Sequence, residues 1–160
     1  MTDPDLLRDL NQALWQAFRT SYRSLDATAL LALYHRDLVR AGGPARSVQG
    51  FDGYAGEIRE FFADMAAQGA SLDIDFRFTE RIGAGELASE RGVFRIVLAG
   101  PDAERIFYGQ FHTFARRIDG TWQFVADYDT TDGGTVTAAS FAAAHGIDDV
   151  LAFAPGAKQP

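Results

Sequence analysis

Cysteine is missing from the sequence, and its absence removes several classes of chemistry at once. Disulfides, thiolate metal sites and cysteine nucleophiles are excluded, which is usual for proteins of a reducing compartment. Basic residues are scarce: 15 Lys and Arg face 22 Asp and Glu, giving a formal net charge of −7 and a pI near 4.8. An acidic chain is a poor partner for nucleic acid or for an anionic membrane surface, so we expect neither.

Long apolar runs and targeting signals are missing as well. No stretch approaches the ~20 residues that a membrane-spanning helix needs. The N-terminal segment, MTDPDLLRDL, is acidic where a signal peptide would be basic. We therefore expect a cytoplasmic protein.

Motifs for metals, nucleophiles and phosphates are absent too. Only His35, His112 and His145 occur, and none has a partner at metal-binding spacing. The chain has no Gly-x-Ser-x-Gly nucleophile elbow and no glycine-rich phosphate loop before a helix. We expect neither a metal nor a cofactor.

What the chain does contain is apolar and aromatic. Its 160 residues are 47% apolar, which is enough for one globular domain with a substantial core. Thirteen phenylalanines, five tyrosines and two tryptophans predict a large aromatic interior or pocket.

The first third of the chain predicts three helices and a short strand. Asp3 can cap a helix whose first position suits Pro4, and leucines and aromatics then recur at three- and four-residue spacing. Asp26 caps a second helix, and Gly69 ends a third. The expected elements are helices over residues 4–22, 26–34 and 54–68 and a strand over residues 37–41.

Four strands and a short tail helix are predicted next. Alternating apolar residues and glycine-rich turns place the strands at 72–79, 86–98, 105–118 and 122–131, with a helix near 137–145. Helices followed by an antiparallel meander define an α+β fold. We expect one domain over residues 1–134 and a helical extension over residues 135–160 packed on it.

The third and fourth strands carry polar side chains among apolar ones. Because side chains alternate along a strand, each set should share one face. If these faces point inward, they line a cavity. The two sets are Tyr108, Gln110, His112, Phe114 and Arg116 on one strand, and Gln123, Val125, Asp127 and Asp129 on the next.

Four segments together resemble a known superfamily. They are Asp26 with Ala-Leu-Leu-Ala-Leu-Tyr34, Ile58-Arg-Glu-Phe-Phe62, Gln110-Phe-His-Thr-Phe114 and Asp119-Gly-Thr-Trp122. In this order they resemble the nuclear-transport-factor-2-like superfamily, above all its SnoaL-like and ketosteroid-isomerase-like branches. The resemblance implies a cone-shaped α+β barrel, in which a curved antiparallel sheet wraps around three helices. It also implies a deep apolar pocket for a small hydrophobic molecule and a homodimer formed sheet to sheet.

One activity of these relatives can be tested on the residues. The resemblance places the general base of a ketosteroid isomerase at Gly42, or at Ala41 if the register slips. The oxyanion tyrosine falls at Phe18 and the oxyanion aspartic acid at His112. All three positions differ from what that reaction needs, so we do not expect a ketosteroid isomerase.

His112 and Asp127 form the strongest remaining candidate pair. A turn at Asp119-Gly120 lies between them, and near-opposite pairing would bring their Cβ atoms to ~5 Å. The carboxylate would then orient the imidazole, and the pair would act as acid and base in an isomerase, cyclase or lyase. Some SnoaL-like cyclases resemble this arrangement. The alternative is a buried polar link between two strands, without catalysis.

Further residues are candidates for contact with the ligand. Asp129 would lie at the pocket mouth, and Tyr34 would offer its hydroxyl. An epoxide hydrolase of related fold would need two carboxylates bridged by an arginine; Asp127 and Arg95 are conceivable members, but no second acid is identifiable. The remaining expected lining residues are Trp15, Phe18, Phe61, Phe62, Gln110, Phe114 and Val125.

Two hypotheses remain for the whole protein. Either it is a small cofactor-free enzyme acting on an apolar, oxygen-bearing molecule, or it is a non-catalytic ligand-binding or dimerisation module. For the dimer, we expect the sheet to present Phe107, Phe111, Phe124 and Tyr128 to a second copy.

Overall fold

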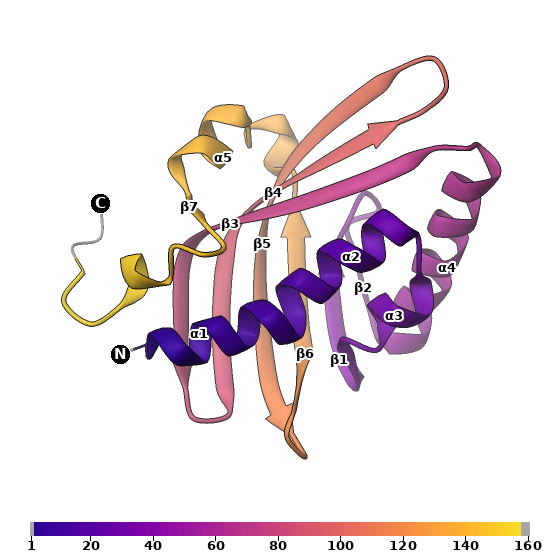
Figure 1. Ribbon diagram of the computed structural model, residues 1–160. Helices are drawn as coiled ribbons and strands as arrows, with labels where there is room; N and C mark the ends of the chain where they lie inside the picture. The colour runs from indigo at the N-terminus through magenta and orange to yellow at the C-terminus, as the bar shows by residue number, and fades with distance from the viewer. Residues whose placement is uncertain (1, 158–160) are drawn as a thin grey trace.

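Helices cover one face of a curved sheet in the computed structural model, which describes residues 2–157 (Figure 1). We call the covered face the inner face and the opposite one the outer face. The described residues form a seven-stranded sheet in the order β2-β1-β6-β5-β4-β3-β7. The strands are β1 (Tyr34–Gly42), β2 (Ser47–Gln49), β3 (Ser71–Ala84), β4 (Leu87–Ala99), β5 (Glu104–Ile118), β6 (Thr121–Thr130) and β7 (His145–Gly146).

The N-terminal helix runs in three consecutive parts across the inner face. These are α1 (Pro4–Leu10), the π-helical turn η1 (Asn11–Gln16) and α2 (Ala17–Ser24). Asp3 caps the start by accepting a hydrogen bond from the amide of Asp5, and Leu25 ends the run in the left-handed region at φ 53°. The expected cap at Asp3 is therefore confirmed. The expected apolar stripe is confirmed as well, because its residues are all buried: Leu7, Leu10, Leu14, Trp15, Phe18 and Tyr22.

Two further helices complete this layer. Asp26 caps α3 (Ala27–Leu31) through the amide of Ala29, as the sequence predicts. The longer α4 (Phe51–Ala67) packs against β1 and β3 and ends before Gly69, which has a φ of +62°. Helices and an antiparallel meander thus give the predicted α+β fold.

The first strand differs most from expectation. β1 begins at Tyr34, where the sequence predicts the end of a helix, and it pairs in parallel with β6. The amide of Phe124 donates to the carbonyl of Leu33 at 2.8 Å, which ties the helix end directly to β6. The short β2 and β7 were not predicted either, because two- and three-residue strands form only through their pairing partners.

Trp15 lies at the centre of the core. Its ring centroid is 4.8 Å from that of Phe76, 5.1 Å from those of Phe78 and Phe111, and 5.3 Å from that of Phe124. These four rings come from β3, β5 and β6, so one helix residue joins three strands. The predicted aromatic interior is present, and at this level it is filled with side chains.

A β-bulge in β6 decides which side chains face inward. The tight turn Asp119-Gly120 pairs Ile118 with Thr121, and this register continues to Ala115 opposite Phe124. Beyond that point Phe114 lies opposite Ala126, so Val125 is the extra residue. The register therefore shifts by one residue. Each residue of β6 after Val125 points to the opposite face from the one that the register near the turn would give it.

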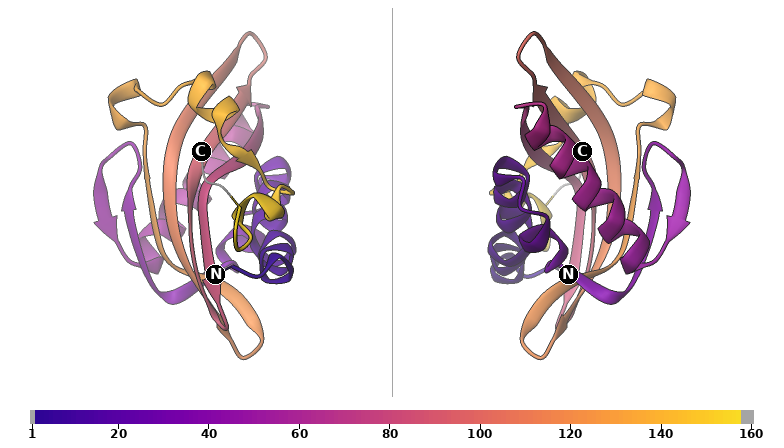
Figure 2. Two further views of the ribbon diagram at one scale, coloured as in Figure 1. Left: turned by 90° about the vertical axis from the view of Figure 1, so that its left-hand side faces the viewer. Right: turned by 90° about the vertical axis from the view of Figure 1, so that its right-hand side faces the viewer.

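The C-terminal segment wraps around the edge of β3 that does not pair with β4. It comprises η2 (Asp132–Gly134), α5 (Ala138–Ala143), β7 and η3 (Val150–Phe153), and it passes over the sheet edge from one side to the other (Figure 2). On the outer face Phe141 packs between the guanidinium groups of Arg77 and Arg95, whose Cζ atoms are 4.8 and 5.0 Å from its ring centroid. On the other side, Ile147 is buried against the N-terminal helix.

No helix within residues 2–157 is both long and apolar enough to cross a membrane.

Candidate active site

Five polar side chains meet on the inner face where β1 and β6 run in parallel. The parallel register sets Arg40 opposite Asp127 and Gly42 opposite Asp129. Tyr34, at the start of β1, and Tyr54, on the first turn of α4, reach the same place. We call Tyr34, Arg40, Tyr54, Asp127 and Asp129 the Asp127 cluster.

Asp127 is held by one carboxylate oxygen only. Its Oδ2 accepts a hydrogen bond from the hydroxyl of Tyr34 at 3.0 Å, and its side chain is 11% exposed. Within residues 2–157, Oδ1 makes no hydrogen bond. Burial raises the pKa of Asp127 to about 6, although Arg40 and the Tyr34 hydrogen bond act against the rise and Asp129 adds to it.

Arg40 lies between the two aspartates. Its Nη2 donates to Oδ2 of Asp129 at 2.6 Å, and its Nε is 3.7 Å from Oδ2 of Asp127. The carboxylate of Asp129 also accepts from the amide of Gly43 at 2.8 Å. Burial alone would lower the pKa of Arg40, but Asp127 and Asp129 together raise it, so Arg40 stays charged.

The two tyrosines of the cluster are uncharged hydrogen-bond donors at neutral pH. Their hydroxyl oxygens lie 3.4 Å apart, and Arg40 sits over the ring of Tyr54 with its Cζ 5.1 Å from the centroid. Burial, reinforced by the charge of Asp127, raises the pKa of both Tyr34 and Tyr54 above the ordinary value for tyrosine. Both phenols therefore keep their protons: Tyr34 donates a hydrogen bond to Asp127, and Tyr54 can donate a hydrogen bond to a ligand oxygen.

This arrangement suits proton transfer. A carboxyl whose pKa lies close to neutral exists in both protonation states under working conditions, so it can either take up or release a proton. One oxygen of Asp127 is fixed and the other makes no hydrogen bond to any residue that the structure describes, which is the geometry of a positioned acid or base.

The predicted pair of His112 and Asp127 is not formed. His112 lies opposite Tyr128 and points to the outer face, whereas Asp127 lies opposite Thr113 and points inward. The Nε2 atom of His112 is 2.8 Å from Oγ of Ser89, and the ring centroid lies 4.7 Å from that of Phe114. The bulge at Val125 is the reason: the register near the turn, continued unbroken, would have set His112 opposite Asp127.

The other predicted site residues separate into three groups. Tyr34 and Asp129 belong to the Asp127 cluster. Trp15, Phe18 and Phe62 are buried in the core, while Phe61 and Val125 are half-buried. Gln110 and Phe114 point to the outer face with His112 and are exposed there. The shared inward face predicted for Gln123, Val125, Asp127 and Asp129 is therefore interrupted at the bulge.

Arg40 and Tyr54 are members of the site that the sequence argument missed. Arg40 had a signal, because buried Leu38 precedes it by two residues in β1 and alternation places both on one face. Tyr54 had none beyond its place on an apolar helix. Arg95, the arginine considered for a bridge between carboxylates, instead packs against Phe141 on the outer face.

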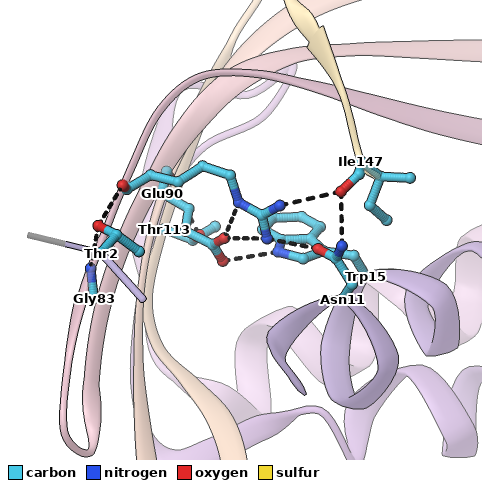
Figure 3. Close-up of polar contacts among 8 residues, drawn as sticks. Thr2, Asn11, Trp15, Gly83, Glu90, Thr113 and Ile147 are labelled. Atoms are coloured by element: carbon cyan, nitrogen blue, oxygen red, sulfur yellow. Dashed lines mark hydrogen bonds and ion pairs between the residues drawn. The ribbon is translucent and has the colours of Figure 1, made fainter. Parts of the chain in front are cut away.

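A second polar cluster lies deeper, between β3, β4 and the N-terminal helix (Figure 3). Arg81 donates from Nε to Oε1 of Glu90 at 2.6 Å, and the indole of Trp15 donates to Oε2 at 2.7 Å. Arg81 also donates to Oδ1 of Asn11 at 2.6 Å. Burial lowers the pKa of Arg81, while Glu90 opposes this effect.

The same cluster fixes the C-terminal segment. The carbonyl of Ile147 accepts from Nδ2 of Asn11 at 2.7 Å and from Nη1 of Arg81 at 3.3 Å (Figure 3). Both oxygens of Glu90 and all three nitrogens of the Arg81 guanidinium have partners. Every polar side-chain atom of this pair is thus engaged by other described residues, so we interpret the cluster as structural.

Cavities and cation sites give no alternative centre. Two cavities, of about 390 and 80 Å³, lie at the C-terminal segment, with His145 and Ala152 in both and Phe78 and Thr79 of β3 in the smaller, and neither includes Asp127. Over the described range, no group of three or more His, Asp or Glu side chains is placed to hold a metal ion.

Comparisons with known proteins identify the fold. Neither a protein-family model nor a curated protein matches the sequence. Among solved structures, a candidate aromatic ring hydroxylase from Novosphingobium aromaticivorans is 22% identical, with a TM-score of 0.63 over 84% of this chain and 100% of that one. A candidate dehydratase of the NTF2-like family from Streptomyces avermitilis is 16% identical, with a TM-score of 0.63 over 79% of this chain and 96% of that one.

A ketosteroid isomerase-like protein from Erwinia carotovora atroseptica is also similar in structure. It is 20% identical, with a TM-score of 0.57 over 76% of this chain and 92% of that one. At these identities the likeness shows the fold, and that fold is the nuclear-transport-factor-2-like one which the sequence resembles.

Proposed function

We propose that this chain, with its nuclear-transport-factor-2-like fold, is a cofactor-independent lyase or isomerase that moves a proton on a small, apolar, oxygen-bearing molecule. The observation that carries the proposal is Asp127. It is buried, its pKa is raised to about 6, Tyr34 fixes its Oδ2, and its Oδ1 is free within the described residues. Buried carboxyls of this kind concentrate at functional sites.

Apolar side chains beside the cluster support an apolar ligand. Phe111 lies opposite Asp129 on the inner face, and alternation along β4 and β5 puts Phe94, Ile96 and Phe107 on that face too. Phe94 and Ile96 are partly exposed, and Phe107 is 45% exposed. Trp15 fills the core behind these apolar side chains. A ligand that covers them would therefore bring its polar end toward Asp129 and Asp127.

The proposed reaction needs only groups of the cluster. As a carboxylate, Asp127 takes a proton at Oδ1 from a carbon next to a ligand carbonyl, while Tyr54 donates a hydrogen bond to the developing enolate oxygen. The same carboxylic acid then returns the proton, either to another carbon or to a leaving hydroxyl. The first outcome is an isomerisation, and the second releases water and leaves a double bond.

The names of the structural neighbours include both kinds of reaction, and the residues of this chain favour the second outcome. One neighbour carries the description of a dehydratase and another that of a ketosteroid isomerase-like protein. Their common fold fits cofactor-free proton transfer, although the isomerase positions of this chain hold Gly42, Phe18 and His112. A dehydration by Asp127 needs none of these three side chains.

The test is turnover of a panel of β-hydroxy ketones, with Asp127→Asn as the decisive variant. Loss of positioned acid/base catalysis should reduce kcat by ~100-fold or more while ligand binding stays nearly unchanged. Asp73→Asn is the control, because Asp73 pairs with Arg23 on the surface, 2.5 Å apart. If Asp127→Asn turns over the panel as well as the native chain, the acid/base role is wrong. If no compound of the panel binds, the chain is a scaffold without this ligand class.

Epoxide hydrolysis is a second candidate, favoured by one specific observation. Arg40 contacts both Asp127 and Asp129, so two carboxylates share one arginine. One carboxylate would activate water while the other, protonated, would donate to the epoxide oxygen as the ring opens. Reaction in ¹⁸O-labelled water separates the candidates, because hydrolysis places one labelled oxygen in the diol and dehydration places none in the alkene.

We also propose a homodimer formed through the outer face. Neighbouring outer-face positions on β1, β5 and β6 carry Val39, Phe114 and Tyr128, all exposed, and α5 covers the opposite half of that face. Of the four residues expected there, only Tyr128 is exposed on the outer face. Phe111 and Phe124 are buried on the inner face, and Phe107 shares that face. A cytoplasmic location remains part of the proposal.

A further inference from the structure

The guanidinium of Arg40 contacts its two aspartates unequally. Nη2 forms a hydrogen bond of 2.6 Å with Asp129, and Nη1 donates to the backbone carbonyl of Ala41. Nε is 3.7 Å from Oδ2 of Asp127, which is too far for a hydrogen bond. This Nε is buried and has no hydrogen-bond partner in the described part of the chain. Arg40 is therefore bonded to Asp129 and only near Asp127.

Asp129 is also held by the backbone of the turn after β1, independently of Arg40. Its Oδ1 accepts from the amide of Gly43 at 2.8 Å. Its own backbone lies against Gly42, where a Cβ would come 1.9 Å from the carbonyl oxygen of Asp129, and Gly42 has a φ of +100°. The turn after β1 thus fits tightly around Asp129 and fixes the carboxylate to which Arg40 bonds.

We propose that Asp129 is a positioning residue: it holds Arg40 at its own carboxylate and so keeps the guanidinium from forming a hydrogen-bonded ion pair with Asp127. Asp127 is left free to exchange a proton. The inference rests on the proposed function only for its consequence in catalysis, since the geometry and its test concern the chain without ligand.

Burial explains why Arg40 bonds to Asp129. The side chain of Asp129 is 27% exposed and that of Asp127 is 11% exposed, so an ionised Asp129 keeps more of its hydration. A hydrogen-bonded arginine lowers a carboxyl pKa by about 1–3 units, which would remove Asp127 from the neutral range. The other titratable groups near Asp127 are the phenols of Tyr34, Tyr54 and Tyr22, which are neutral and cannot replace Arg40.

The test is Asp129→Asn in the full chain, followed by two NMR readouts. Carboxyl ¹³C titration should show the pKa of Asp127 falling by about 1 unit or more, as Arg40 turns to the remaining carboxylate. The side-chain Nε–H resonance of Arg40 should move downfield, because this group gains an acceptor. Asp73→Asn is the control and should change neither signal. An unmoved Nε–H resonance overturns the proposal.

Charge and position must be separated, since removing Asp129 also removes a repulsive charge. In an Arg40→Gln background, Asp129→Asn can act by charge alone, so we expect a clearly smaller shift of the Asp127 pKa there. Equal shifts in both backgrounds overturn the positioning role. If Arg40→Gln does not fold, the Nε–H resonance in Asp129→Asn alone decides, because charge removal without movement gives this group no acceptor.

Failure of this inference is distinguishable from failure of the proposed function. A fall in the Asp127 pKa together with a downfield Nε–H resonance of Arg40, without turnover of any compound, supports the positioning role and rejects the enzyme. Turnover that depends on Asp127, with no change of its pKa or of the Arg40 Nε–H resonance in Asp129→Asn, supports the proposed function and rejects the positioning role. Where both hold, Asp129→Asn should shift the acid limb of the kcat/KM profile to lower pH by the same amount as the pKa.

Discussion

Arg81 and Glu90 lie directly opposite each other on β3 and β4 and form an ion pair whose side chains are 0% and 1% exposed. The guanidinium also packs over the ring of Phe78, with its Cζ 4.1 Å from the centroid. Because both charges are fully satisfied and enclosed, removing one partner leaves the other unpaired in the core.

Glu90→Gln should therefore destabilise the protein by ~3–5 kcal/mol in urea unfolding, the usual cost of breaking a buried pair. The matched control is Glu80→Gln. Glu80 pairs with Arg91 at 3.1 Å on the same two strands, but both side chains are partly exposed. The loss from Glu80→Gln should stay within about 1 kcal/mol. Equal losses from the two variants would mean that burial does not strengthen the Arg81–Glu90 pair.

Asp127 should make stability depend on pH in a defined direction. Its pKa is about 6 in the folded chain, against an ordinary value near 4, so the folded state binds the proton more tightly. The stability that this proton contributes is fully present below pH ~4 and is lost as the pH rises through ~6.

Asp127→Asn cannot lose that contribution, because the amide does not titrate. Relative to the native chain, the variant should gain roughly 2–3 kcal/mol between pH 4 and pH 8, with the midpoint at pH ~5, halfway between the unfolded and the folded pKa. Urea unfolding of both proteins across this range measures the difference in their free energies of unfolding. The contributions of the other titrating groups are common to both proteins and cancel in this difference. A difference that is flat with pH would mean that Asp127 has the same pKa folded and unfolded.

The C-terminal segment should contribute strongly to stability. Truncation after Gly134 removes Phe141, Ile147 and Val150 from buried positions and takes the Ile147 carbonyl away from Asn11 and Arg81. A buried donor left without an acceptor costs ~1–3 kcal/mol, in addition to the lost apolar contacts. The melting temperature should fall by roughly 5 °C or more.

Scanning calorimetry measures this change. Truncation after Gly156 is the control, because it leaves each of these contacts in place and should melt like the full chain. Equal melting of the Gly134 truncation and the full chain would show that the segment does not stabilise the body of the protein.

The sequence predicts the helices and long strands of this fold because their signals are local. Asp3, Asp26 and Gly69 mark helix ends where the structure has them. The faces of β6 depend on something else, namely one extra residue at Val125. Neither Val125 nor Ala126 carries a conformational signal such as a glycine, so the bulge is decided by how β6 pairs with β5 and β1 together.

The extra residue at Val125 is the reason why the predicted site differs from the observed one. It turns Asp127 and Asp129 toward Arg40 and leaves His112 on the outer face. Asp127, Asp129 and Tyr34 could be predicted as site residues because they are polar or aromatic groups in apolar elements. Their arginine could not be paired with them, because the parallel contact of β1 with β6 joins residues almost 90 positions apart.

The outer face supplies the last prediction. Phe114 lies opposite Ala126, which in turn lies opposite Val39, so three strands present a continuous apolar strip. Exposed strips of this kind mark association surfaces, and a two-fold interface repeats the same residues on both copies. Light scattering at micromolar concentration should give twice the chain mass of 17.5 kDa. Phe114→Glu should give the single-chain mass, because its charge would be buried opposite an apolar surface.

The control is Leu151→Glu, at an exposed apolar residue of the C-terminal segment, which should stay dimeric. A native chain that scatters as 17.5 kDa, or a Phe114→Glu variant that remains a dimer, would rule out this face as the interface.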